Sequence, residues 1–240
     1  MNLILDIGNT STKTAVYNGQ QLISRSREKR FSYHKLRKNL FPYHIDKAII
    51  SSVKEIPEQL LNQLSSDIPL IHILTYKSLL PFIIEYDTPQ TLGADRVAAV
   101  AGAFNRFPSS EVLVIDAGTA ITYDFLSGHI YKGGNISPGL LIRFRALNRF
   151  TGRLPLISPT YTYSFPGKNT SDAIAAGVIT GLGYEINEYI RTFKKQHVEC
   201  TIILTGGDSE FLLNKIDHEV KYMPDIVTDG LNYILNYNAK

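Results

Sequence analysis

The chain has 240 residues, of which 44% are hydrophobic and 20% are charged, and its formal net charge is +3. This composition is typical of a globular protein with one large domain or two smaller ones, and it excludes a low-complexity chain. A net charge this small gives no reason to expect a polyanionic partner, so we expect no nucleic-acid binding.

The first residues lead directly into an apolar run, with neither a charged leader nor a long apolar span. We therefore expect a cytoplasmic protein with no membrane partner. Cys200 is the only cysteine, which excludes an intrachain disulfide, and we interpret it as a small side chain packed beside an apolar strand. The six histidines have no paired metal-ligand spacing, so we expect no zinc site.

The first part of the chain predicts alternating strands and helices, which indicates an α/β architecture. Strands are expected over residues 3–7, 14–17, 23–27, 47–51 and 70–74. Helices are expected near residues 33–40 and from about residue 57 to residue 65, with Pro57 in the first turn of the second helix.

Two groups of basic residues lie between the second and fourth of these strands. They are Arg25, Arg27, Lys29 and Arg30, followed by Lys35, Arg37 and Lys38. No nucleic-acid motif and no aromatic interleaving accompany them, so we interpret them as a solvated face.

A predicted helix begins at Gly93-Ala94-Asp95-Arg96, after a loop over residues 86–92. The helix dipole opposes an arginine in the first turn, so Arg96 needs another reason to be there, and an anionic substrate would supply one. Asp95 could simply stabilise the helix terminus as a first-turn carboxylate. Pro108-Ser109-Ser110 follow the helix, and we place a domain boundary there, between residues 1–109 and 110–240.

The second half predicts strands over residues 113–117 and 120–125. Residues 133–139 lead into a helix through Leu147, and Thr170 is expected to cap a long helix that runs toward Lys195. Helix N-termini attract anions, so these two could face a ligand or merely begin a helix. A strand over residues 201–204 ends in two glycines that would leave flat room for an adenine ring, and another helical segment follows.

An Asp-x-Gly turn occurs twice, each time at the end of an apolar strand, as Asp6-Ile7-Gly8 and as Asp116-Ala117-Gly118. Glycine lets the backbone approach a ligand closely, the Thr and Asn side chains that follow offer donors to phosphate oxygens, and the Asp can hold a hydrated cation. One copy alone could be an ordinary hairpin turn. Two copies favour two related lobes that clamp the phosphates of one nucleotide.

Six motifs follow one another along nearly the whole chain. They are Asp6-x-Gly8-Asn9-Thr10, Tyr86 followed by Gly93-Ala94-Asp95-Arg96, Asp116-x-Gly118-Thr119, Gly133-Gly134-x-Ile136-x-Pro138-Gly139, Asn169-Thr170-x-x-Ala173 and Thr205-Gly206-Gly207-Asp208. In this order they resemble the motifs of the type III pantothenate kinases, in the superfamily of acetate and sugar kinases, Hsp70 and actin. The resemblance implies an α/β fold with two similar ribonuclease H-like (actin-like ATPase) domains and a cleft between them.

The resemblance also implies an activity, the ATP-dependent phosphorylation of pantothenate as the first step of coenzyme A biosynthesis, in a homodimer. It implies that Asp95 accepts the proton and that Asp116 holds a monovalent cation, K⁺ or NH₄⁺. The ATP-binding residues that it implies are Asp6, Ile7, Gly8, Asn9, Thr10, Ser11, Thr12, Lys13 and Thr119. The pantothenate-binding residues that it implies are Tyr86, Gly93, Ala94, Asp95, Arg96 and Thr170.

Physical reasoning agrees with these assignments, because a kinase mainly positions the attacking hydroxyl and neutralises charge on the transferred phosphoryl group. In a loose transition state the hydroxyl proton is lost late, so an ionised Asp95 can orient the hydroxyl and accept the proton afterwards. We expect Asp6 to hold Mg²⁺ through water, because this ion keeps much of its hydration shell. Lys13 could reach a phosphate or point into solvent.

Two alternatives remain, because a fold and an ATP clamp do not identify the acceptor. One is a kinase for another small hydroxylated acceptor, and the segment from Tyr86 to Arg96 argues against it. The other is a nucleotide-dependent regulatory (transcription accessory) protein of the same fold. Asp95 disfavours this second alternative, because a pure binder does not need a carboxylate at an acceptor hydroxyl.

Overall fold

The computed structural model describes residues 1–40 and 42–239, which form two compact units. The first unit consists of Met1–Ser109, Gly128–Gly133 and Asp225–Lys240, and the second of Ser110–Ser127 and Gly134–Pro224. The units share the boundary after Ser109 with the expected division into residues 1–109 and 110–240. They differ from it because two later segments return to the first unit. That the two units act as functional lobes stays a prediction.

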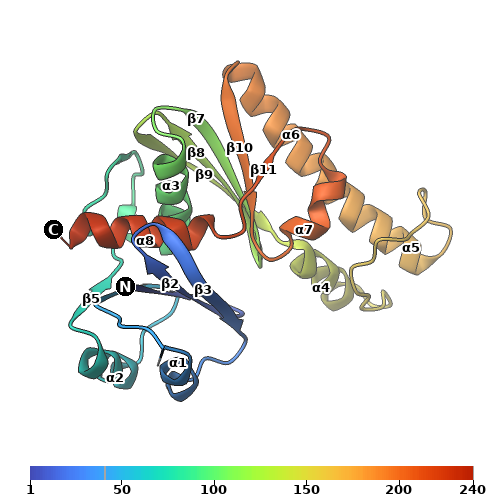
Figure 1. Ribbon diagram of the computed structural model, residues 1–240. Helices are drawn as coiled ribbons and strands as arrows, with labels where there is room; N and C mark the ends of the chain where they lie inside the picture. The colour runs from blue at the N-terminus through green and yellow to red at the C-terminus, as the bar shows by residue number, and fades with distance from the viewer. Residues whose placement is uncertain (41, 240) are drawn as a thin grey trace. The chain divides into compact units, whose positions relative to one another are not determined.

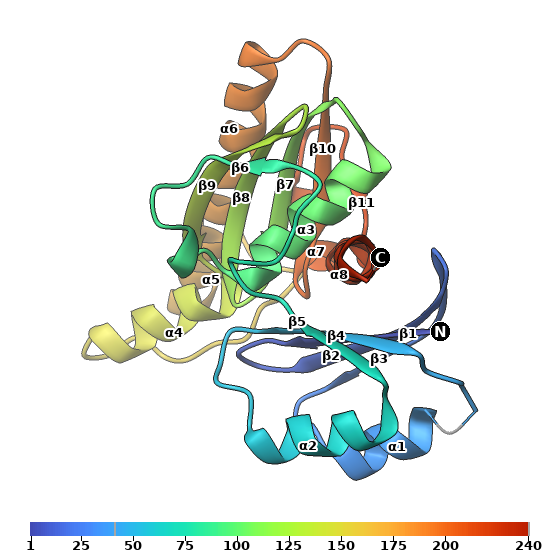
Figure 2. The ribbon, with the colours of Figure 1, turned by 90° about the vertical axis from the view of Figure 1, so that its left-hand side faces the viewer.

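The sheet of the first unit has the strand order β3-β2-β1-β4-β5. These strands are β1 (Asn2–Ile7), β2 (Thr12–Asn18), β3 (Gln21–Glu28), β4 (Lys47–Ser52) and β5 (Leu70–Ile73). Strand β1 is antiparallel to β2 and parallel to β4. One face packs against α1 (Tyr33–Leu40) and α2 (Glu58–Asp67), and the other against α3 (Ala94–Arg106) and α8 (Ile226–Asn238) (Figure 2).

The second unit repeats this plan with the strand order β9-β8-β7-β10-β11 (Figure 1). Its strands are β7 (Glu111–Ala117), β8 (Ala120–Ser127), β9 (Ile130–Pro138), whose first residues belong to the first unit, β10 (Cys200–Thr205) and β11 (Lys221–Tyr222). Strand β7 is antiparallel to β8 and parallel to β10, as β1 is to β2 and β4. The internal repeat that the two Asp-x-Gly turns predict is therefore present in the strand pairing.

The sheet of the second unit packs against helices, and Leu113 and Ile115 of the sheet share one core with Ile186 and Ile190 of the longest helix. Within the described residues, the second unit has four α-helices and one π-helical turn. They are α4 (Leu140–Phe150), α5 (Thr170–Ala175), a π-helical turn (Ala176–Thr180), α6 (Gly181–Gln196) and α7 (Ser209–Leu212). The long helix expected from residue 170 to residue 195 thus exists, with a π turn inside it.

The expected cap of that long helix is wrong. Asn169 is the N-cap residue, and its side-chain Oδ1 accepts a hydrogen bond of 2.9 Å from the backbone N–H of Asp172. Asn is at least as good an N-cap as Thr, and Asn169 has the extended backbone that this position requires. Thr170 is instead the first helical residue, and it is exposed.

Several short elements were not expected from the sequence. Strand β6 (Ile83–Ile84) pairs in parallel with Ile130 and Tyr131 of β9, and two 3₁₀ turns cover Pro89–Thr91 and Leu213–Lys215. Strand β11 has only two residues. Such short segments contain too few residues to show a period, so local patterning does not reveal them.

Helices α3 and α8 cross with their backbones in direct contact. A Cβ atom on Gly230 of α8 would lie 1.8 Å from the carbonyl oxygen of Ala98, and one on Gly102 of α3 would lie 2.2 Å from the carbonyl oxygen of Ile226. Both distances are far below any van der Waals contact. Only glycine at these two positions therefore allows the two helices to approach this closely.

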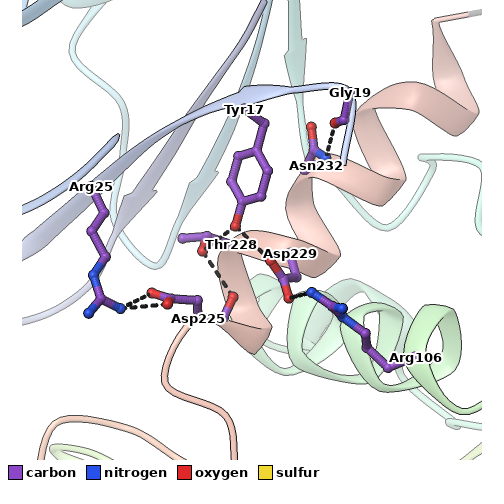
Figure 3. Close-up of polar contacts among 8 residues, drawn as sticks. All are labelled: Tyr17, Gly19, Arg25, Arg106, Asp225, Thr228, Asp229 and Asn232. Carbon is purple, nitrogen blue, oxygen red and sulfur yellow. Dashed lines mark hydrogen bonds and ion pairs between the residues drawn. The ribbon is translucent and has the colours of Figure 1, made fainter. Parts of the chain in front are cut away.

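Polar contacts hold α8 to its neighbours in the first unit (Figure 3). Asp229 accepts hydrogen bonds of 2.8 Å from the Tyr17 hydroxyl of β2 and from the Arg106 guanidinium at the end of α3. Asn232 donates a hydrogen bond of 2.8 Å to the carbonyl oxygen of Gly19. Burial raises the pKa of Tyr17, so this hydroxyl stays protonated as a donor. One partly buried carboxylate therefore links β2, α3 and α8.

The close contact of α3 and α8 at Gly102 and Gly230 predicts that a larger residue there destabilises the protein. Gly230→Ala should lower the free energy of unfolding by about 1–3 kcal/mol or more, because the added methyl group forces α8 away from Ala98. Gly181→Ala is the matched control, because no heavy atom lies within 4 Å of its Cβ position. It should leave stability unchanged or raise it by up to about 1 kcal/mol. Denaturant unfolding measures both, and an equal loss in the two variants would contradict the packing argument.

Candidate functional site

The first Asp-x-Gly turn joins β1 to β2. The backbone N–H of Gly8 donates a hydrogen bond of 3.1 Å to the carbonyl oxygen of Ser11, which closes the turn. A Cβ atom on Gly8 would lie 3.2 Å from that oxygen, so the tight turn favours glycine. Asn9 and Thr10, between these two residues, are exposed. The ATP-binding residues expected over residues 6–13 thus form one turn and the strand ends beside it.

A row of four polar side chains crosses the sheet at this turn. Asp6 of β1 lies opposite Ser51 of β4 and Lys13 of β2, and Lys13 lies opposite Arg27 of β3. Directly opposed residues point to the same face of a sheet. That face is the one covered by α3 and α8, because Asn2, four residues before Asp6, hydrogen-bonds α8. We call these four residues the polar row.

Asp6 carries an unfavourable charge in this row. Burial raises the pKa of Asp6 above its ordinary value; the charge of Lys13 opposes that rise, and the charge of Asp95 adds to it. The Lys13 ammonium lies 4.0 Å from the Asp6 carboxylate. Asp95 therefore lies close enough to Asp6 for the two carboxylates to repel each other, which brings the expected proton acceptor and the expected magnesium residue together in the first unit.

The start of α3 places Asp95. Its Oδ1 accepts a hydrogen bond of 2.9 Å from the backbone N–H of Arg96, and a Cβ atom on Gly93 would lie 2.6 Å from the same oxygen. Glycine at the N-cap therefore leaves room for the carboxylate. The Arg96 side chain is only 5% exposed, and its Cζ lies 5.9 Å from the centre of the Tyr86 ring. The structure thus gathers these residues, whereas Thr170 belongs to the second unit.

A cavity of about 610 Å³ lies beside the start of α3 in the same unit. Its lining comes from the start of α3, from the segment after β4, and from the loops after β5 and β6. The lining residues are Ser52, Val53, Lys54, Glu55, Leu74, Thr75, Tyr76, Leu80, Ile84, Pro89, Gln90, Thr91, Leu92, Gly93, Ala94 and Val97. Lys54 also donates a hydrogen bond of 2.9 Å to the carbonyl oxygen of Asn9, so the cavity wall reaches the first Asp-x-Gly turn, whose proposed ligand is phosphate and which we call the phosphate turn.

The second Asp-x-Gly turn, in the second unit, is shorter than the first but also closes with a hydrogen bond from its glycine. Gly118 donates a hydrogen bond of 3.0 Å to the carbonyl oxygen of Ala120, and Asp116 lies opposite Thr205 of β10 as Asp6 lies opposite Ser51. The Thr205 side chain is fully buried, and its hydroxyl has no hydrogen-bond partner among the described residues. Asp116 thus has a buried hydroxyl group beside it.

Two glycines pack directly on this second turn. A Cβ atom on Gly139 would lie 2.2 Å from the carbonyl oxygen of Gly118, and one on Gly206 would lie 2.3 Å from that of Ala117. Gly206 also has a φ of +100°, which favours glycine. β7 therefore fills the Cβ position of Gly206, and room for an adenine ring at the two glycines stays a prediction.

Four residues beside the two turns had no role predicted from the sequence, although Thr205 stands in the sixth motif. Ser51 and Thr205 lie opposite the two aspartates, and Arg27 and Lys54 contact the first turn. The available signal was weak. In each unit, the strand parallel to the one with the Asp-x-Gly turn has a hydroxyl residue at or next to its last position. The basic residues gave no signal, because Arg27 sits in a run of exposed cations.

The donor sets at the two turns fit cations in different ways. Across residues 1–40 and 42–239, no group of three or more His, Cys, Asp or Glu side chains could hold a metal ion. A cation at Asp6 would relieve the repulsion between that carboxylate and Asp95, and Mg²⁺ commonly takes its other ligands from water and phosphate. Asp116 and the Thr205 hydroxyl offer oxygen ligands, which suit a hard monovalent cation.

No helix in the described part of the chain combines the length and the apolarity that a membrane span requires.

The model of the family "Type III pantothenate kinase" matches residues 2–192. The chain belongs to this family. Curated relatives agree along the full length. The type III pantothenate kinase of Porphyromonas gingivalis strain W83 is 43% identical over 242 residues, which cover 99% of each chain. That of Bacteroides fragilis strain YCH46 is 42% identical over 240 residues, which cover 99% of this chain and 98% of the relative. The family expected from the six motifs is confirmed.

Solved structures confirm the α/β fold of the pantothenate kinase chain. A structure from Campylobacter jejuni, described as a conserved Baf family transcriptional activator, has a TM-score of 0.64 and 24% identity, and the match covers 99% of this chain and 98% of that one. A ROK family glucokinase from Streptomyces griseus has a TM-score of 0.53 and 11% identity, with 99% of both chains covered. At these identities the likeness shows the fold alone.

The unfavourable charge of Asp6 predicts that its removal stabilises the protein. In protein without nucleotide or metal, Asp6→Asn should raise the free energy of unfolding at pH 7, because the neutral amide removes both the desolvation of a charge and the repulsion from Asp95. The pKa of Asp6 is higher in the folded protein than in the unfolded chain, so wild-type stability falls as pH rises between these two values. The advantage of the variant should therefore shrink as pH falls toward about 4, where Asp6 becomes protonated in both states.

Denaturant unfolding at pH 7 and pH 4 measures this difference. Asp46→Asn is the control, because a hydrogen bond from the N-terminal amine holds the pKa of Asp46 below its ordinary value. This substitution should not stabilise the protein at pH 7. An Asp6→Asn variant that is less stable than wild type at pH 7 would contradict the assigned strain.

Proposed function

We propose that this chain transfers the terminal phosphoryl group of ATP to the primary hydroxyl of pantothenate, the first step of coenzyme A biosynthesis. The observation that carries the proposal is the placement of Asp95. Its carboxylate lies at the start of α3, where Oδ1 accepts a hydrogen bond from the backbone N–H of Arg96, and its charge adds to the burial that raises the pKa of Asp6. Family membership supports pantothenate as the acceptor.

The chain's own groups account for the chemistry. Asp95 orients the pantothenate hydroxyl and accepts its proton, and late proton loss in a loose transition state makes a weak carboxylate base sufficient. The turn from Gly8 to Ser11 offers backbone N–H groups and hydroxyls to the phosphates. When bound, Mg²⁺ neutralises charge on the phosphates, and Asp6 would hold it through water. Lys13 supplies a further positive charge 4.0 Å from Asp6.

Pantothenate also carries a carboxylate, which needs a cationic partner. Arg96 supports this role, because its guanidinium is almost completely buried and lies over Tyr86 beside Asp95. A buried arginine can bind a carboxylate through two parallel hydrogen bonds. Gly93 and Ala94 complete the segment around the acceptor. Thr170, exposed at the start of α5, is the remaining residue proposed to contact pantothenate.

The second turn is proposed to serve ATP and a monovalent cation. Asp116 would hold K⁺ or NH₄⁺, and the buried Thr205 hydroxyl next to it supports an oxygen-ligand site. Thr119, directly after the turn, is proposed to contact ATP. These ions need few charged ligands, so one carboxylate with neutral oxygens suits them better than it suits zinc.

The active form is proposed to be a cytoplasmic homodimer. Large apolar side chains exposed in the second unit support association with a second copy of the chain. They include Phe150 at 81%, Leu156 at 60%, Tyr161 at 65%, Phe165 at 67% and Tyr184 at 63% exposure. Light scattering should give twice the chain mass of 26.9 kDa, and a monomer at micromolar concentration would contradict the dimer.

Release of ADP tests the proposed reaction. With ATP, Mg²⁺ and K⁺, we expect turnover that requires pantothenate, because only the acceptor hydroxyl beside Asp95 completes the reaction. Glucose and N-acetylmannosamine are control acceptors and should give no ADP above background. Turnover with a sugar, or ATP binding without turnover on pantothenate, would contradict the proposal.

The same assay in Na⁺ as the only monovalent cation tests the proposed cation site. We expect markedly slower turnover than in K⁺ or NH₄⁺. Equal rates in the three salts would contradict a selective site at Asp116.

A further inference from the structure

We propose that Arg27 is an additional ATP-binding residue, which holds a phosphate that remains on ADP after transfer. The inference rests on the proposed kinase function. It goes further by assigning a role to a side chain outside all six motifs. Arg27 lies on β3, in a run of basic residues that by pattern alone resembles a solvated face.

The contact that singles out Arg27 is with the phosphate turn itself. Its Nε donates a hydrogen bond of 2.9 Å to the Ser11 hydroxyl, and Ser11 is the residue whose carbonyl closes the turn onto Gly8. Arg27 also lies opposite Lys13 and points to the same face of the sheet. Arg27 thus forms the β3 end of the polar row, at the edge of the proposed phosphate site.

The charge of Arg27 is available to a ligand. In the described part of the chain Arg27 forms no ion pair, whereas Arg25, two residues earlier on the same strand, is paired with Asp225 (Figure 3). Lys35, in the second basic group, is paired with Glu28. A guanidinium has five N–H donors, and using Nε leaves the two terminal nitrogens to face phosphate oxygens.

The position in the row decides which phosphate Arg27 contacts. The proposed function assigns the acceptor hydroxyl to Asp95 and the magnesium ion to Asp6, which together would place the transferred phosphoryl group at the Asp6 end of the row. Arg27 lies two strands away from Asp6, which is about 10 Å at the usual strand spacing. The guanidinium therefore reaches phosphates that are not transferred, and it binds ATP and ADP alike.

Uniform binding of substrate and product has a kinetic signature. Arg27→Ala should raise the KM for ATP and the Kd for ADP, each about tenfold, because it removes charge-assisted hydrogen bonds. It should leave kcat and the KM for pantothenate unchanged, because the contact is equal in the ground state and the transition state. The KM for ATP and the Kd for ADP of Arg27→Lys should lie between those of Arg27→Ala and wild type, because lysine keeps the charge but loses the planar fork of donors.

Arg25→Ala is the matched control, on the same face of β3 but tied to Asp225. It should bind ADP with wild-type affinity. ADP titration by calorimetry needs no pantothenate, so it separates this inference from the proposed acceptor. Unchanged ADP affinity in Arg27→Ala would overturn the inference, as would a loss of kcat at unchanged KM for ATP. A wild-type chain that binds no ADP would overturn both the inference and the proposed function.

Discussion

The backbone contact between α3 and α8 is the constraint on which the first unit depends. Gly102 and Gly230 let the two helices touch, and Asp229 fixes the end of α3 through Arg106. The other end of α3 carries Asp95, so the same crossing that stabilises the helix pair also sets where the proposed base stands. Helix α8 thus helps to position Asp95, which lies at the start of α3.

Function and stability oppose each other at the polar row. Asp6 is buried, and the charge of Asp95 adds to the cost of ionising it, so a bound cation is needed to make this a favourable place for a charge. A bound cation and the phosphates it neutralises would turn this arrangement into a favourable one. Surrounding packing offsets the strain, since the Leu3 and Leu5 side chains beside Asp6 in β1 are completely buried.

Local patterns predicted much of this structure. The apolar runs that become β1, β4, β7 and β10, and the helix that begins at Ala94, are visible because each has a clear period and a clear boundary. The Asp-x-Gly turns were visible for the same reason, whereas the roles of the site residues came from the resemblance to the type III pantothenate kinases. The cap of α5 was misplaced by one residue, because Asn169 and Thr170 are adjacent and both are good caps.

What escaped prediction depends on contacts between distant parts of the chain. The return of α8 to the first unit rests on glycine contacts with α3, more than 120 positions earlier along the sequence. The pairing of Ser51 with Asp6, and of Thr205 with Asp116, follows from register between strands that no local pattern specifies. Arg27 has the composition of a solvated residue, and only the β2–β3 register places it beside the phosphate turn.

The most direct test of the account is the Asp95→Asn variant, compared with wild type for both binding and turnover. The amide has nearly the same shape as the carboxylate but cannot accept the proton. Calorimetry should show ATP and pantothenate affinities close to those of wild type, and kcat should fall about 10²- to 10⁴-fold. An unchanged kcat would show that Asp95 is not the proton acceptor and would contradict the central claim.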